Sequence, residues 1–115
     1  MADRGAYRVG MIRNVVLGRL RTSADARAAA QDRRQVEEGL AGILGLDLPG
    51  LVSNHLGWDC QLREGGWDFA ITSDWRDAGS YRNYDVDAEH NRYRQLIADV
   101  CQHIARVQFE IPDTR

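Results

Sequence analysis

The amino-acid sequence predicts one α+β domain, built in the order β-α-β-β-α(α)-β, that completes itself by pairing with a second copy. The 115-residue chain has the size of a single domain. Stretches with a two-residue apolar period, typical of strands, stand before and after a long stretch with helical periodicity. A Gly-Gly turn joins two of these strands into a hairpin.

The first half of the chain predicts a strand, a helix and a second strand. Dense β-branched and aliphatic residues indicate a strand over residues 7–20, whose alternation places Ile12, Asn14, Val16 and Gly18 on one face. A helix is expected over residues 24–44, beginning at the hydroxyl-then-acid pattern of residues 22–25. The second strand is expected over residues 51–60 and carries His55.

The second half predicts the rest of a four-stranded antiparallel sheet. The turn at residues 63–66 leads into a strand over residues 67–73, with Phe69 and Ile71 on one face. Asp77 is expected to cap a short helix and Asp87 a longer one that runs to Gln102. A two-residue period from Ile104 to Ile111 indicates the closing strand. The order is that of the ferredoxin-like split βαβ arrangement.

Composition limits the classes of partner. A net charge of −2 with interspersed signs gives no basic patch for nucleic acid. No apolar run is long enough to span a membrane, and the N-terminus lacks the apolar core of a signal peptide. The two cysteines and three histidines show no metal-ligand spacing. We therefore expect a cytoplasmic protein with free thiols, no metal and no cofactor.

One sheet face should need a partner. Helices on one side of four strands leave the other side uncovered, and we expect that side to carry Asn14, Val16 and Gly18. A substantially apolar face of this size favours association. A two-fold homodimer with its sheets face to face would cover it and enclose a cavity for a small apolar or aromatic ligand.

Tyr84 and His90 are the residues that point most directly to chemistry. His90 lies in the first turn of the last expected helix, where the helix dipole and burial both favour a neutral imidazole. Such a group accepts a proton at physiological pH, and the Tyr84 phenol can donate one. A structural core histidine beside an interface tyrosine is the alternative. His55 either lines the cavity or is an exposed strand histidine.

Several segments resemble the stress-responsive α/β barrel (Dabb) family. They are the first strand from Met11 to Leu17, the stretch from Gly66 through Trp75 to Tyr84, and the run from Asp87 to His90. The likeness covers residues 11–111, which leaves residues 1–10 as an N-terminal extension and residues 112–115 as a C-terminal tail. The resemblance implies a homodimeric ferredoxin-like barrel.

The resemblance also implies roles for particular residues. A plant polyketide cyclase of this family closes a carbonyl chain without metal or redox cofactor, and His90 and Tyr84 match its pocket histidine and tyrosine. Asn14 and Phe69 stand where two further pocket histidines would be, so half of that catalytic set is missing. Glu110 matches a family acid that would orient His90 or Asn14.

Two functions from different classes follow. The first is a cofactor-independent cyclase, lyase or isomerase acting on a polyketide-like or aromatic carbonyl compound, with a monooxygenase of the same architecture as a variant. His90 would move a proton, Tyr84 would polarise the carbonyl and the Asn14 amide would donate to the enolate. The second is a non-catalytic stress-responsive dimer. An open pocket on which His90, Tyr84 and Asn14 converge would favour the first. An interior filled by Phe69, Ile71 and tryptophan side chains would favour the second.

Overall fold

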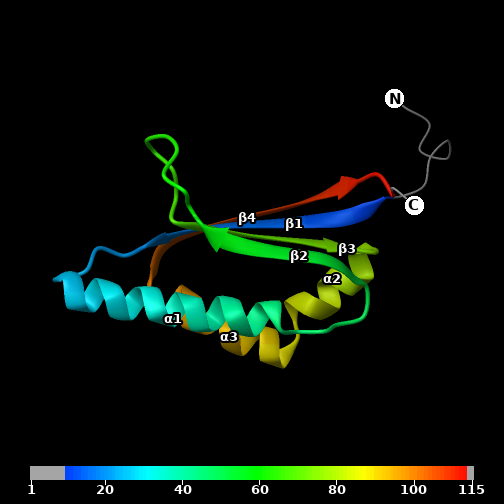
Figure 1. The fold of residues 1–115 in the computed structure, drawn as a ribbon. Helices are drawn as coiled ribbons and strands as arrows, with labels where there is room; N and C mark the ends of the chain where they lie inside the picture. Colours follow the sequence, from blue (N-terminus) through cyan, green and yellow to red (C-terminus); the bar gives the residue numbers. More distant parts are fainter. Residues whose placement is uncertain (1–9, 114–115) are drawn as a thin grey trace.

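The computed structural model describes residues 10–113 as a four-stranded antiparallel sheet with helices packed on one face (Figure 1). The strand order is β2-β3-β1-β4, and this confirms the ferredoxin-like α+β fold expected from the sequence. The predicted N-terminal extension, apart from Gly10, and the last two residues lie outside the described range. Along the chain the elements are β1 (Met11–Leu20), α1 (Ala26–Leu44), β2 (Leu51–Trp58), β3 (Phe69–Trp75), α2 (Ala78–Asp85), α3 (Ala88–Ala98) and β4 (Cys101–Ile111).

Local hydrogen bonds fix where the helices begin. Asp77 and Asp87 cap α2 and α3 as predicted, accepting from the backbone N–H of Ser80 at 2.8 Å and of His90 at 2.9 Å. The start of α1 differs from the prediction. Its cap is Asp25, which accepts from the backbone N–H of Ala28 at 2.9 Å, so the helix begins later than expected.

The boundary between α3 and β4 was predicted wrongly. The helix ends at Ala98 rather than Gln102, and β4 begins at Cys101, which pairs with Leu20 of β1. Buried Val100 lies at the junction. Strand pairing along the whole length of β1 therefore overrides the helical spacing of apolar residues, because each added rung satisfies backbone groups that a longer helix would take away from the sheet.

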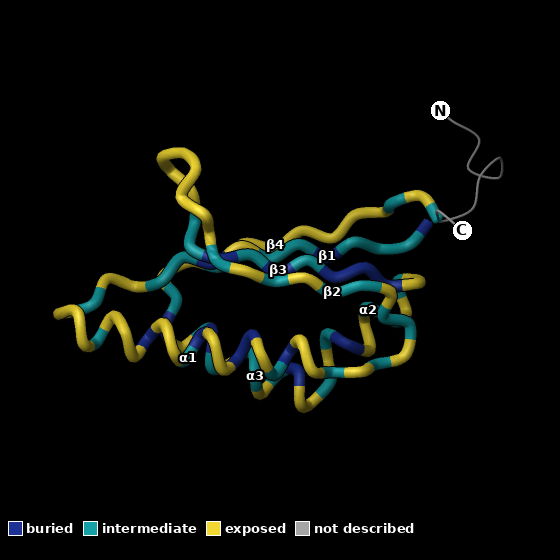
Figure 2. The backbone as a smooth tube through the Cα atoms, in the orientation of Figure 1, coloured by how far each residue is buried: buried dark blue, intermediate teal, exposed yellow. Residues whose placement is uncertain are grey.

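The assignment of the two sheet faces was also wrong. Asn14 is only 2% exposed, and the face that it shares with Val16 and Gly18 is the one covered by the helices. Figure 2 shows buried segments gathering between the sheet and the helices, while much of β4 is exposed. The open face instead carries Val15 and Leu17, opposite Val107 and Ala105 of β4.

The core lies between α1, α3 and the central strands. Val36, Leu40 and Ile43 of α1 are buried against the sheet, whose helix-facing side chains include Phe69, Ile71 and Trp75. Two glycines of α1 allow α3 to approach closely. A Cβ on Gly39 would contact Ile97, and one on Gly42 would overlap the Tyr93 ring.

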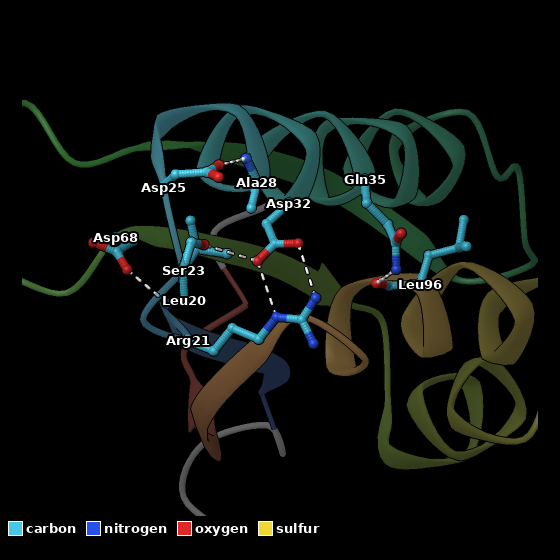
Figure 3. Close-up of polar contacts among 9 residues, drawn as sticks. All are labelled: Leu20, Arg21, Ser23, Asp25, Ala28, Asp32, Gln35, Asp68 and Leu96. Atoms are coloured by element: carbon cyan, nitrogen blue, oxygen red, sulfur yellow. Dashed lines mark hydrogen bonds and ion pairs between the residues drawn. The ribbon is translucent and has the colours of Figure 1, made fainter.

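Polar contacts fix α1 against the ends of its neighbours (Figure 3). Arg21, just after β1, makes a two-pronged ion pair with the buried Asp32 of α1 at 2.9 and 3.0 Å. The Ser23 hydroxyl donates to the same carboxylate at 3.2 Å. Farther along α1, the Gln35 amide donates to the Leu96 carbonyl of α3 at 2.9 Å. These contacts hold the helix layer in register over the sheet, and thereby set the shape of the space between them.

The connection between β2 and β3, residues 59–68, rises from the sheet on the side away from the helices (Figure 1). Gly65 in this connection has φ of +83°, a conformation that favours glycine, as the predicted Gly-Gly turn requires. Asp68 ties its end to β1 by accepting from the backbone N–H of Leu20 at 2.7 Å.

Candidate functional site

A narrow pocket lies between the sheet and the helices of a single chain. Its volume is about 40 Å³, on the measure by which one water molecule needs roughly 10–15 Å³. The cavity was expected between the sheets of two subunits, whereas this pocket lies within one chain, because Asn14 and Val16 face the helices. The lining is mostly apolar with a few polar groups: Asn14, Val16, Ile43, Phe69, Ile71, Tyr81, Tyr84, Asp85, His90, Arg94, Ile97, Ile104 and Arg106.

His90 reaches this pocket from the first turn of α3. Its backbone N–H is held by the Asp87 cap, and its side chain is 5% exposed. Burial, with the charge of Arg94 as the second cause, lowers the pKa of His90 to about 4, although Asp85, the Tyr84 carbonyl and Asp87 act in the opposite direction. The imidazole is therefore neutral at pH 7. Its Nδ1 atom is buried and makes no hydrogen bond within residues 10–113.

Tyr84 lies in the last turn of α2, beside His90. The two ring centroids are 3.8 Å apart with the planes tilted by 33°, and the Trp75 ring covers the tyrosine at 4.6 Å. Burial is the main cause that raises the pKa of the Tyr84 phenol, so the phenol keeps its proton at neutral pH. The phenol makes no hydrogen bond with any other residue in the described part of the chain.

Asn14 presents a fixed amide from the middle of β1. Its Nδ2 donates to the Ser73 hydroxyl at 3.3 Å, and its Oδ1 accepts from Gln108 at 3.0 Å. The same hydroxyl accepts from Trp75 Nε1 at 2.9 Å. The hydrogen bond from Gln108 to Oδ1 thus fixes which way the amide points, and the second N–H of Nδ2 can donate to a ligand.

The structure brings together most of the residues that the sequence singled out. His90, Tyr84 and Asn14 line one pocket with Phe69 and Ile71, and Val16 completes this wall.

Two predicted pocket residues lie elsewhere. His55 is exposed on β2, opposite Thr72, and its charge acts on Asp74 of the open face. Glu110 is exposed on β4 opposite Ile12 and does not line the pocket. His55 had been left open between cavity and surface, and in the single chain it lies exposed on the open face of the sheet.

Sequence reasoning missed the charged rim of the pocket. Arg94 follows His90 by four residues on α3, a spacing that places both on one helix face. Arg106 shares a face of β4 with Ile104, two residues before it, and pairs with helix-facing Val16 of β1. Both signals were present in the sequence.

The arrangement suits a small, largely apolar ligand with one oxygen. Neutral His90, the protonated Tyr84 phenol and the Asn14 amide are the polar groups along the apolar part of the wall. Over residues 10–113, no three His, Cys, Asp or Glu side chains gather as a metal site. Within the same range, no helix has the length and apolar character to cross a membrane.

Comparison with known proteins supports the fold. No protein-family model matches the chain, and no curated protein matches it, so the Dabb resemblance has no support from sequence comparison. Similar solved structures include a dimeric ferredoxin-like protein of unknown function from Thermobifida fusca, with 26% identity and a TM-score of 0.73 over 89% of this chain and 92% of that one.

Two further solved structures show the same fold at lower identity. A Dabb family protein from Mesorhizobium loti is 14% identical, with a TM-score of 0.66 over 90% of this chain and 97% of that one. A hydroxynitrile lyase from Passiflora edulis is 16% identical, with a TM-score of 0.65 over 94% of this chain and 99% of that one. The chain thus has the ferredoxin-like fold found in Dabb proteins and in a small-molecule lyase.

Proposed function

We propose that this chain is a Dabb-type small-molecule-binding protein that performs cofactor-independent acid–base chemistry on an aromatic or polyketide-like carbonyl compound. The chemistry is that of a lyase, isomerase or cyclase. His90 is the proton acceptor, and Tyr84 and Asn14 donate hydrogen bonds to the carbonyl oxygen. The occurrence of a hydroxynitrile lyase on this fold supports the proposal as an example of small-molecule chemistry in the same architecture.

One observation carries the proposal: the buried Nδ1 of His90 has no hydrogen-bond partner in residues 10–113. Leaving a buried polar atom unpaired costs roughly 1–3 kcal/mol. The imidazole contacts the Tyr84 carbonyl, but its Nδ1 is left unpaired in a pocket that it shares with a phenol and an amide. A bound ligand would supply the missing partner.

The proposed step moves one proton and one electron pair. His90 removes a proton from the carbon next to the ligand carbonyl, and the C–H electron pair shifts to make an enolate on the carbonyl oxygen. Tyr84 and Asn14 then hydrogen-bond that oxygen as its charge develops. The low pKa makes His90 a weak base in the empty pocket. A negative oxygen formed beside it raises that pKa, which favours the transfer when the ligand is bound.

The same proposal includes a homodimer formed through the open sheet face. Leu17 is 38%, Val107 52% and Phe109 44% exposed, and β1–β4 pairing sets them in one apolar stripe. An exposed stripe of this kind marks an interface. The Thermobifida fusca protein of the same fold is dimeric. In this arrangement each subunit keeps its own pocket, because the pocket lies on the helix side of the sheet.

Proton exchange tests the chemistry directly. The protein is incubated in D₂O with benzoylacetone, an aromatic β-diketone, and the loss of its α-proton signal is followed by ¹H NMR. We expect catalysed exchange that falls by about 10²–10⁴-fold in His90→Ala, the range for one acid–base group. His55→Ala is the matched control, since His55 is exposed outside the pocket, and it should exchange at the wild-type rate. Exchange at the wild-type rate in His90→Ala would refute the role of His90.

A second candidate function is ligand binding without chemistry, and the narrowness of the pocket favours it. Closely stacked Tyr84 and His90 rings leave about 40 Å³, so a ligand larger than a few waters must displace side chains. Benzoylacetone that binds the wild-type protein but exchanges no faster than in buffer would identify a binding protein. Catalysed exchange would exclude that function.

A further inference from the structure

The mouth of the pocket is charged, in contrast with its apolar interior. Tyr81, Asp85, Arg94 and Arg106 line the pocket and also a shallow hollow beside it, whose other walls are Gln95, Ala98 and Gln108. These four shared residues therefore form the passage between solvent and the space beside His90. A ligand that enters through this passage places one end among them.

The charges of this rim do not cancel. Arg94 pairs with Asp85 at 3.2 Å. Arg106 pairs with no carboxylate in the described part of the chain. Its charge is nonetheless close enough to oppose the burial that raises the pKa of Tyr81. With His90 and both tyrosines neutral, the rim keeps one unbalanced positive charge at the end of an apolar pocket.

From this geometry we infer that the ligand is an acid, an aromatic or alkyl ketone whose carboxylate pairs with Arg106 at the mouth while its apolar part lies against Phe69 and Ile71. The inference rests on the proposed function and specifies its substrate class. A planar guanidinium suits a carboxylate, because two N–H groups can reach its two oxygens. Glu110 lies farther along β4 and lines neither hollow.

The acid also explains the balance of charges around His90. Arg94 lowers the pKa of that imidazole, second only to burial. A carboxylate at the rim would offset the arginine charge, and the pKa of His90 would rise on binding. His90 would therefore be a stronger base in the ligand-bound protein than in the empty pocket.

Matched probes test the inference. We would measure by calorimetry the dissociation constants of 3-benzoylpropionate and of its methyl ester, which share the aromatic ketone and differ in charge. The wild-type protein should bind the acid about tenfold more tightly than the ester at low salt, the contribution of one charge-assisted, partly exposed pair. Arg106→Gln should bring the acid to the affinity of the ester and leave the ester unchanged. Arg19→Gln, a β1 arginine that lines neither hollow, is the control.

The possible results distinguish failure of the carboxylate inference from failure of the proposed function. Equal binding of acid and ester by the wild-type protein would overturn the carboxylate inference while the pocket still binds ketones. Loss of acid binding in Arg106→Gln together with an equal loss of ester binding would overturn it as well, since the arginine would then act on the pocket as a whole. Failure of both probes to bind, with benzoylacetone also inactive, would overturn the proposed function and the inference that rests on it.

Discussion

Replacing His90 by phenylalanine should make the protein less sensitive to acid without weakening it at neutral pH. The pKa of His90 lies at about 4 in the folded chain against 6.5 unperturbed. Between these values the unfolded chain binds a proton that the folded chain does not, so the free energy of unfolding falls as the pH drops from about 6.5 to 4. At 1.36 kcal/mol per pKa unit, the loss contributed by His90 approaches about 3 kcal/mol.

At pH 7 the same substitution should be neutral or stabilising. The Nδ1 atom is buried without a partner, so removing it relieves a cost of roughly 1–3 kcal/mol, which offsets the loss of the imidazole contact with the Tyr84 carbonyl. A phenyl ring has the ring shape needed to keep the stacking on Tyr84. The result would be a residue retained for function at the expense of stability.

Urea unfolding at pH 7.0, 5.5 and 4.5 measures both effects. The quantity to compare is the difference in unfolding free energy between His90→Phe and the wild-type protein at each pH, because the carboxylates shared by both proteins cancel in that difference. The difference should grow in favour of the variant as the pH falls. A difference that stays constant over this range, or a variant destabilised by more than about 1 kcal/mol at pH 7, would contradict the burial and the unpaired Nδ1.

Two other predictions concern the fold and its pairing. A Cβ on Gly18 would overlap the ring of buried Phe69, whereas a Cβ on Gly57 would meet nothing within 4 Å. Gly18→Ala should therefore lower the free energy of unfolding by about 1–3 kcal/mol in urea. Gly57→Ala, measured in the same way, should lower it much less. Leu17→Lys should convert the proposed dimer to a monomer in light scattering, because it places a charge in the apolar stripe with Val107. A dimer that persists would move the interface elsewhere.

Local chemistry allowed much of the fold to be predicted. The caps at Asp77 and Asp87 depend on a side chain and a backbone N–H three residues away, so the sequence alone identifies them. The place of His90 in the first turn of α3 follows from the second cap. The sequence could also place Tyr84 near His90, because Tyr84 lies in the last turn of α2, shortly before the Asp87 cap.

What could not be predicted depended on contacts between distant segments. Strand alternation separates Val16 from Val15 and Leu17, but both sets are apolar, so the period alone does not tell which set meets the helices. The end of α3 was decided by pairing of Cys101 with Leu20, far away in the sequence. The charged rim needed both kinds of information, because Arg94 and Arg106 become neighbours of one hollow only after β4 is placed beside β1.

The central claim, that a ligand pairs with the Nδ1 atom of His90, is tested most directly by ¹⁵N NMR of histidine-labelled protein. Spectra are recorded at pH 7 with and without saturating benzoylacetone, and His55 and His103 serve as internal references because neither lines the pocket. We predict that the Nδ1 resonance of His90 shifts as this atom gains a hydrogen bond, while the resonances of the other two histidines stay unchanged. An unchanged His90 resonance would contradict it.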